Sequence, residues 1–398
     1  MSDEAPPAGS SDSVRHARDL GLNVLVVGVA LIALQNFPPL PIRGAQLSDG
    51  IAGLGAPLVL ATTLRIGGWS ALVPSRAATV AAVGYALFAC VSFATAGGSA
   101  MRLLGYVWLV GFGFAVSVAG QDADVAQRLR RALIVAALIG AVTGLVGAVL
   151  FWTGKPTGLL NIAGDLVPGN YPRIRGTLGR ANALAGLLAT GLLLVGDVPR
   201  RWRVPVAIVL AVALVFTFSR SWIALGASGA VWWLALTPKH TRMRDIAAVL
   251  VVLATIAVML AVSWLEIRVD PTRPFATTIG DGVGTRWIHL NDALSTISAH
   301  PLGVGPGRAA TYNGWDAHFS PINIAAVIGI PAAIAFVVLF ALALVRSIRA
   351  ARDGDIVFRG VAAALVLFGI DALARDIEDQ RALWVLLGLA LVGRVRRR

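Results

Sequence analysis

Long apolar runs alternate with shorter polar segments along almost the whole chain. A helix needs about 20 residues to cross roughly 30 Å of hydrocarbon, and a segment inside lipid must satisfy its own backbone hydrogen bonds. Twelve apolar runs qualify, some of them short, at 19–36, 48–64, 77–95, 102–120, 132–152, 182–196, 204–219, 221–237, 246–264, 322–345, 357–374 and 380–393. The pattern predicts an all-α, polytopic integral membrane protein with about 12 transmembrane helices.

Basic residues between the runs predict the orientation. Arg15 and Arg18 precede the first run, every even-numbered run leads into a segment with arginine or lysine, and Arg394 opens a basic stretch at the end of the chain. Cytoplasmic loops of membrane proteins carry such an excess of positive charge. We therefore expect both termini in the cytoplasm and two long extracytoplasmic loops, 153–181 and 265–321, the second of which precedes the tenth span.

The predicted spans and loops form one folded domain between two polar tails. We expect a disordered cytoplasmic tail over 1–18, since Met1 to Ser13 is polar and rich in proline and serine. A single transmembrane domain covers 19–393, and 394–398 form a basic cytoplasmic tail. The first apolar run is not followed by a small-residue cleavage site, so we interpret it as an uncleaved span rather than a signal peptide.

Composition supports the membrane assignment. Of the 398 residues, 57% are hydrophobic and 14% are charged, with a mean hydropathy of +0.76, whereas a soluble chain carries roughly 25% charged residues. The net charge is +13, but most basic residues lie in the predicted cytoplasmic segments, so we expect no nucleic-acid partner. Cys90, the one cysteine, lies in an apolar run and is expected to be a small buried residue.

Arginines in the outer segments are the first candidates for function. Arg220 lies in a minimal outer turn although basic residues prefer the inner face, so we expect it to bind an anion. Guanidinium groups and the N-terminus of a helix both suit phosphate. That combination occurs before the sixth span, where the candidates are Arg173, Arg175, Arg180 and Asn182. An arginine bound to a lipid phosphate and an ordinary solvated basic loop are the structural alternatives.

The loop before the tenth span holds the other candidates. Arg286 lies near the start of an amphipathic helical pattern, where a cation is unfavourable for the helix dipole, so a functional role is favoured. His318 lies where the chain returns to the membrane, and an imidazole beside arginines suits a general base acting on a sugar hydroxyl. His300 and His289 are weaker candidates, because one precedes a proline and the other lies in mid-helix. Gly303 to Gly307 lacks GxGxxG spacing and predicts only a tight turn.

Carboxylates are expected to lie apart from these groups. Asp49 and Asp316 are isolated in the sequence, and the other outer carboxylates gather in the last outer loop, 371–381. Without a carboxylate pair at the site, we expect neither a bound metal nor another cofactor. Arginines would then stabilise the charge of a leaving diphosphate.

In this order, the segments resemble the O-antigen ligase and O-antigen polymerase-like family. The matching segments are Arg175 to Ala185, Phe218 to Trp222, Arg286 to Gly305 with its His-Pro-Leu-Gly-Val-Gly end, and Ala317-His318 leading into a span. Together they lie within roughly residues 130–345 and agree with the twelve-span topology. The chain departs from the family pattern after His318, where Phe319 replaces a frequent asparagine and no acidic residue follows early in the next span.

The resemblance implies an activity and residue roles. Members of the family transfer a polyprenyl-diphosphate-linked glycan to an acceptor hydroxyl on the outer face of the cytoplasmic membrane, without a metal. By this similarity, Arg220 and Arg286 bind the diphosphate and His318 activates the acceptor. The substrate contacts that we expect besides these are Arg173, Arg175, Arg180, Asn182 and His300.

We therefore interpret the chain as a metal-independent, inverting glycosyltransferase of the bacterial inner membrane that acts in cell-envelope polysaccharide biosynthesis. Its expected partners are the lipid-linked donor, a glycan, lipid or protein acceptor, the bilayer and other envelope-synthesis proteins. Ligase and polymerase share the donor and differ in the acceptor, so both stay open.

Three other functions are considered. A twelve-span transporter of a lipid-linked or anionic substrate predicts charged or broken helices at mid-membrane and related halves, and the sequence has neither. A different polyprenyl-phosphate-sugar transferase predicts carboxylates in the first outer loop, which has none before Asp49. A non-catalytic scaffold of an envelope synthesis complex is the third alternative.

Overall fold

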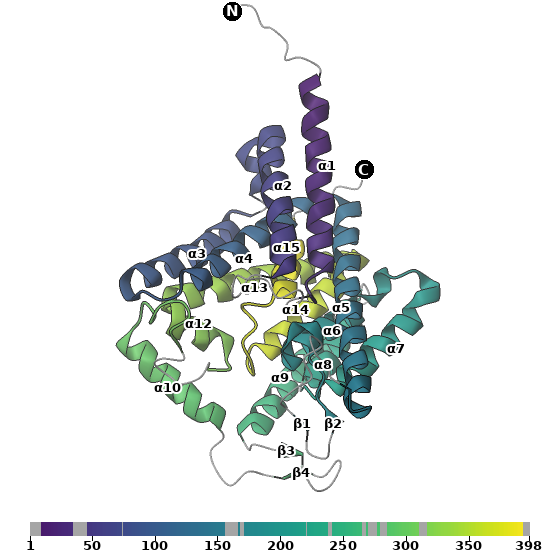
Figure 1. Ribbon diagram of the computed structural model, residues 1–398, viewed down its shortest axis with the longest axis vertical. Coiled ribbons are helices and arrows are strands. Elements are labelled where there is room, and N and C mark those ends of the chain that lie inside the picture. The colour runs from purple at the N-terminus through teal and green to yellow at the C-terminus, as the bar shows by residue number, and fades with distance from the viewer. Residues whose placement is uncertain are drawn as a thin grey trace, which may run out of the picture.

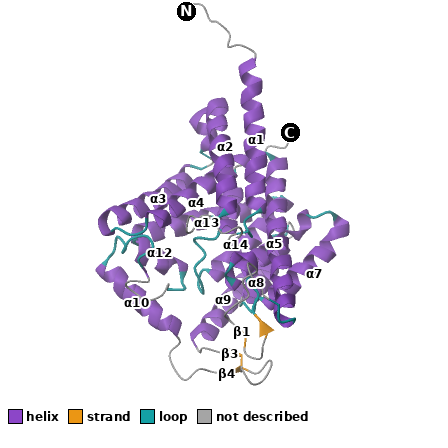
Figure 2. Cartoon of the chain, viewed as in Figure 1, coloured by secondary structure: helices purple, strands orange, loops and turns teal. Residues whose placement is uncertain are grey.

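The computed structural model is a bundle of α-helices (Figure 1). It describes residues 9–34, 46–73, 75–155, 166–167, 171–219, 221–237, 241–264, 268–269, 277–278, 285–309 and 317–392. Figure 2 shows how little of this is strand. Among the described residues, the strands are two antiparallel pairs: β1 Leu166–Val167 with β2 Tyr171–Pro172, and β3 Arg268–Val269 with β4 Thr277–Thr278. The prediction of an all-α fold is confirmed.

Each of the twelve predicted apolar runs contains a helix. In chain order these are α1 Gly9–Ala30, α2 Leu47–Leu72, α3 Arg76–Ala96, α4 Ala100–Ala119, α5 Ala123–Trp152, α6 Ala181–Leu194, α7 Arg200–Phe216, α8 Ser221–Leu234, α9 Arg242–Trp264, α12 Ser320–Ile328 with α13 Ile330–Arg352, α14 Ile356–Asp371 and α15 Arg381–Leu391. The long outer loop adds α10 Thr285–Ala299 on the predicted amphipathic pattern. Within the described part of the chain, six helices, α2, α3, α4, α5, α9 and α13, are long and apolar enough to cross a membrane. The structure thus supports a multi-pass membrane protein, and the count of twelve spans stays a prediction.

The first helix begins earlier than the sequence pattern indicated. α1 starts at Gly9, inside the segment that we expected to be disordered. Asp12 lies in its first turn, where a carboxylate interacts favourably with the helix dipole. Once the apolar part of a helix has formed, each further residue adds a hydrogen bond at little cost, so the helix extends back into the polar segment.

Cys90 is exposed on α3, so the expectation that it is buried was wrong. α3 is one of the six helices apolar enough to cross a membrane, and its outward face is apolar as well as its core face. When a helix is hydrophobic all round, composition does not distinguish the side that packs against protein from the side that faces outward.

The tenth predicted span is two helices, α12 and α13, rather than one. Gly329 separates them with φ 99°, a conformation that glycine adopts at little cost. The predicted tight turn, Gly303 to Gly307, packs into this break, and the amide of Gly305 donates to the carbonyl of Val327 at 3.0 Å. A Cβ added at Gly303 would lie 2.6 Å from the same carbonyl oxygen. The glycine run is therefore a structural turn, as predicted.

Segments that we assigned to one side of the membrane contact one another. Arg130 pairs with Asp197, with Nε 2.8 Å from Oδ2, and Arg352 pairs with Asp245 at 2.7 Å. All four lie in or beside predicted cytoplasmic segments. The predicted outer segments lie at the opposite end, where Figure 1 shows β1–β4 and α10 far from the beginning of α1. The predicted topology, including which end faces the cytoplasm, stays a prediction.

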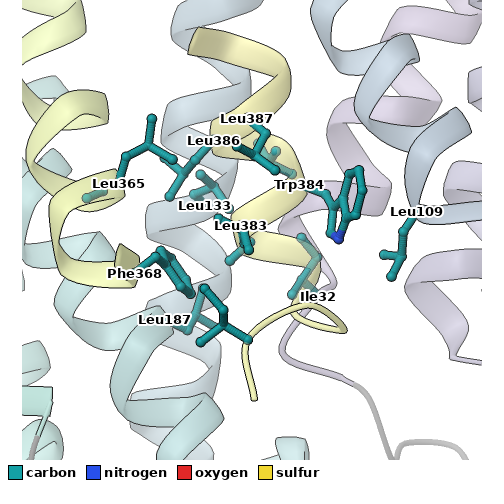
Figure 3. Close-up of a cluster of buried hydrophobic side chains, with 14 of the residues drawn as sticks. Ile32, Leu109, Leu133, Leu187, Leu365, Phe368, Leu383, Trp384, Leu386 and Leu387 are labelled. Atoms are coloured by element: carbon teal, nitrogen blue, oxygen red, sulfur yellow. The ribbon is translucent and has the colours of Figure 1, made fainter. Parts of the chain in front are cut away.

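α15 lies in the centre of the bundle, and all its residues from Ala382 to Leu391 are buried. α15 approaches α4 closely because residue 388 is a glycine. A Cβ at that position would lie 2.6 Å from the carbonyl oxygen of Gly113. Figure 3 shows the side chains around it: Leu109 of α4, Leu133 of α5, Leu187 of α6 and Leu365 and Phe368 of α14 surround Leu383, Trp384, Leu386 and Leu387. This core fixes the start of α15 and with it the loop that precedes it.

The orientation can be tested by thiol labelling. In a Cys90→Ser background, cysteine placed at 160 or 310 is expected to react with a membrane-impermeant thiol reagent added outside intact cells. Cysteine at 125 or 240 is expected to react only after the membrane is opened. Labelling of position 310 only in opened membranes would overturn the predicted orientation.

Candidate functional site

Several outer segments meet at Arg375, in the loop between α14 and α15. Its guanidinium forms an ion pair with Asp371, one helical turn earlier, and donates to the carbonyl of Asn182 at the start of α6. The carbonyl of Arg375 accepts from Ser320 Oγ, at the start of α12, at 2.9 Å. Arg375 is 6% exposed and Asp371 is 1% exposed. A buried ion pair needs such additional hydrogen bonds, and here they join α6, α12 and α14.

A glycine on α6 makes room for this guanidinium. A Cβ added at Gly186 would lie 2.6 Å from Nη2 of Arg375. Real Cβ atoms do not come this close to a neighbour, so any larger residue at position 186 would displace the arginine from Asp371.

Asp371 also holds the turn between α7 and α8. Ser221 Oγ donates to Asp371 Oδ2 at 3.2 Å, and Ser219 Oγ lies 3.1 Å from Ser221 Oγ. Phe218 has φ 47°, a conformation that is uncommon for residues other than glycine. Arg220, our candidate for the diphosphate, lies outside the described residues. Of its two neighbours, Ser221 contacts the buried carboxylate and Ser219 contacts Ser221.

The basic segment before α6 is attached to the same turn. Arg173 donates through Nε to the carbonyl of Thr217 at 2.9 Å and through Nη2 to Asn182 Oδ1 at 2.7 Å. Arg173 and Asn182, which we expected to contact substrate, thus bind each other and hold the turn against α6. Arg175 follows on the same segment and is half-buried.

Arg180 lies at the rim of this region. Its Nη1 is 3.1 Å from Asp379 Oδ2, and 58% of its side chain is exposed. Together with Asp379 it lines a shallow pocket whose apolar part includes Ile32, Leu178 and Leu187. Arg180 therefore faces solvent at the edge of the site, seven residues after Arg173 in the sequence.

His318 lies two residues before the start of α12 and beside the last outer loop. Its Nδ1 is 3.8 Å from Asp376 Oδ2, and 40% of its side chain is exposed. His318 has φ 53°. Among the described residues other than glycine, Phe218 and His318 are the two with a positive φ, and both lie at this end of the molecule. Backbone conformations of this kind cost free energy and often occur at functional sites.

α10 brings a second histidine to the first. The ring centroids of His289 and His318 are 6.0 Å apart, with an angle of 48° between the ring planes. α10 packs on α12 through Ala293, which is fully buried against Ala317 and Ala326. Arg286 lies one turn before His289, and residues three apart share a face of a helix. The side chain of Arg286 lies outside the described residues.

His300 does not join this group. It ends α10 and is exposed, and its carbonyl accepts from the amide of Gly303 in the turn that packs at Gly329. This places it near the C-terminal end of α12, whereas His318 precedes the first residue of that helix. The nine residues of α12 span about 13 Å at 1.5 Å per residue.

The expectation that carboxylates lie apart from the site was wrong. Four side chains of the loop 371–381 contact candidate segments: Asp371 at Ser221, Asp376 at His318, Glu378 at Asn323 and Asp379 at Arg180. Nothing in the sequence pairs these segments, because they meet only once α14 and α15 pack into the core. Among the described residues, no three His, Cys, Asp or Glu side chains form a candidate metal site, and metal independence stays a prediction.

Glu378 joins the last outer loop to α12. Its Oε1 accepts from Asn323 Nδ2 at 2.8 Å and its Oε2 from the amide of Ile377 at 3.0 Å, while its carbonyl accepts from Trp384 Nε1 at 2.8 Å. Burial, and next the charge of Asp379, raise the pKa of Glu378 from 4.5 to about 7. Asn323 occupies the part of the span in which the resembled family often has an acidic residue.

No family model matches this chain, and no curated protein matches it either. What the site is able to do therefore follows from its own geometry.

The packing of α10 on α12 can be tested by placing a larger side chain at their contact. Ala293→Leu adds three heavy atoms where Ala293 is fully buried against Ala317, and such insertions typically cost about 1–3 kcal/mol. We expect α10 to move away from α12, with an increase in proteolysis of the 265–319 segment. Ala299→Leu, the same addition at an exposed position of α10, is the matched control. Equal proteolysis of the two variants would contradict this packing.

Glu378 predicts a pH dependence of stability. Because its pKa is higher in the folded protein than the reference value of 4.5, its contribution to the free energy of unfolding is complete below about pH 4.5. That contribution is lost as the pH rises through about 7. We expect the thermal unfolding midpoint in detergent to fall across this window in the wild type and to fall less in Glu378→Gln. Parallel curves for the two proteins would refute the assignment.

Proposed function

We propose that this chain transfers a polyprenyl-diphosphate-linked glycan to an acceptor hydroxyl at the outer surface of the bacterial cytoplasmic membrane. The observation that carries the proposal is the pairing of His318 with Asp376, whose Nδ1 and Oδ2 atoms lie 3.8 Å apart. A partly exposed imidazole with a carboxylate behind it is the arrangement of a general base. The motifs that resemble the O-antigen ligase and polymerase-like family supply the substrate class.

In the proposed reaction, the acceptor oxygen attacks the anomeric carbon and His318 takes its proton through Nε2. Asp376 faces the other ring nitrogen, so it favours the tautomer with the proton on Nδ1 and stabilises the imidazolium that forms. The separation of 3.8 Å is longer than a hydrogen bond, and catalytic hydrogen bonds commonly shorten when substrate binds. A single displacement inverts the configuration at the anomeric carbon.

The lipid diphosphate leaves with the electron pair of the broken bond. We assign its charge to Arg175, Arg220 and Arg286. Support for Arg175 comes from the backbone, since the amide of Ile174 donates to the carbonyl of Phe216 at 3.0 Å and so brings this segment to the turn that carries Arg220. Guanidinium groups bind two phosphate oxygens at once, which suits a leaving diphosphate.

The place of this activity would be cell-envelope polysaccharide biosynthesis, as a ligase or as a polymerase. The donor binds from the bilayer, and the acceptor is a glycan, a lipid or a protein that reaches the outer surface. Other envelope-synthesis proteins are expected neighbours in the membrane.

A transporter is the second candidate. That function favours charged groups near the middle of the membrane. The ion pairs among the described residues lie instead at the ends of helices, as with Arg130 and Asp197 at one end and Arg375 and Asp371 at the other. This distribution favours surface chemistry, whereas a non-catalytic scaffold would leave the pairing of His318 with Asp376 without a role.

The base is tested by substitution. His318→Ala is expected to lower glycan transfer about 10²–10⁴-fold, the usual contribution of one positioned base, while binding of the lipid donor stays close to wild type. Asp376→Asn should leave the donor affinity unchanged and reduce the rate less than His318→Ala. His240→Ala, in a predicted cytoplasmic loop, is the control. Wild-type transfer by His318→Ala would refute the mechanism.

The diphosphate site is tested by replacing arginine with lysine. Arg220→Lys and Arg286→Lys keep the charge and lose the planar fork that binds two phosphate oxygens, so both variants should lose most of the activity and bind donor more weakly. Transfer by the wild type is expected to persist in EDTA. Loss of transfer in EDTA with recovery on addition of a divalent cation would indicate the metal-dependent class of transferases instead.

A further inference from the structure

His289 is a titratable group at the site to which the proposed mechanism gives no role. His289, in the middle of α10, has its ring centroid 6.0 Å from that of His318. It comes from a different element, and α10 is held in place by the packing of Ala293 on Ala317, the residue before His318. The contact is thus a consequence of how α10 is docked and not of chain proximity.

We infer that His289 acts through His318 as a proton relay, accepting the proton that His318 removes from the acceptor hydroxyl and passing it to solvent. The inference rests on the proposed function. It is a role for an additional residue at the site, which neither the charge pattern nor the sequence motifs assign.

The relay completes the proton balance of the reaction. The acceptor O–H bond breaks and its proton moves to Nε2 of His318, while the new bond forms between the acceptor oxygen and the anomeric carbon. The bond from that carbon to the diphosphate breaks, and its electron pair stays on the diphosphate. His318 is then an imidazolium and must lose the proton before another acceptor binds, and His289 is the neighbouring imidazole that can take it.

The geometry suits transfer through one water molecule. A water that hydrogen-bonds to both rings joins nitrogens up to about 5.6 Å apart. Rings whose centroids lie 6.0 Å apart can therefore share one water when a nitrogen of each ring points toward the other ring. Both histidines are partly exposed, so His289 can pass the proton on to solvent. Neutral imidazole accepts and releases protons near physiological pH.

Other charged groups around His289 define its electrostatic surroundings. Asp292 lies one turn further along α10 and is exposed, and Arg286 lies one turn before His289. From the elements packed against α10 come His318 and, through it, Asp376. Asp376 favours a proton on His318, whereas a positive charge on His289 would disfavour one there.

The experiment combines a titration with a rate measurement on the full-length protein in nanodiscs. The chain has five histidines, so carbon-13 labelled histidine gives a spectrum in which the His318 signal is identified by its loss in His318→Gln. A unit charge at this distance shifts a titration midpoint by about 0.5–2 pH units. We expect the midpoint of His318 to move by that amount in His289→Gln, and not in His16→Gln.

The rate measurement separates a relay from a merely structural contact. We expect His289→Gln to lower the turnover number about tenfold or more, with little change in KM for donor or acceptor, and added imidazole to restore part of the rate to His289→Ala. A structural role would move KM and would not respond to imidazole.

Each other result counts against the inference in a distinct way. An unchanged His318 midpoint in His289→Gln would show that the two rings do not interact. A shifted midpoint with a wild-type turnover number would refute the relay. A shifted midpoint together with no glycan transfer by the wild-type protein would refute the proposed function itself, and the relay with it, while leaving the contact between the rings established.

Discussion

The buried ion pair between Arg375 and Asp371 is the interaction on which the outer end of the molecule depends. Through it and the hydrogen bonds around it, the start of α6, the turn between α7 and α8 and the start of α12 are joined to the last outer loop. Removing one partner of such a pair commonly costs about 3–5 kcal/mol because the other charge is left buried. The same pair also places Asp376, which follows Arg375 directly, beside His318.

The site is consequently assembled from segments that are remote in the sequence and individually short. The arginine-bearing turn and the basic segment before α6 are held by backbone contacts and by Arg173, whereas the base is held by the acidic loop. α10 closes the arrangement from the other side through the packing of Ala293. Arg173 and Asn182 position these segments. In the proposed mechanism, the diphosphate is therefore bound by Arg175 and by the two arginines whose side chains lie outside the described residues.

The sequence predicts much of the fold and only part of the site. Apolar runs of sufficient length specify helices, so each predicted run contains one, and the glycines at 303–307 specify a turn. The break at Gly329 escapes prediction because an isolated glycine is also tolerated inside a helix. Asp376 escapes for a different reason, and His289 was only a weaker candidate: their partner His318 reaches them only through tertiary packing, which no local pattern encodes. The sequence does contain one local signal for the ion pair in the acidic loop. Asp371 and Arg375 carry opposite charges at positions i and i+4, a spacing that predicts an ion pair.

The central claim is that donor binding and proton removal take place at this single outer site. The most direct measurement is a structure of the protein in a lipid nanodisc with a polyprenyl-diphosphate-sugar donor that cannot be transferred. The account predicts the diphosphate between the basic segment before α6 and the turn that carries Arg220, with the anomeric carbon facing Nε2 of His318. A diphosphate bound at the opposite end of the bundle, near Arg130, or outside the reach of His318, would contradict it.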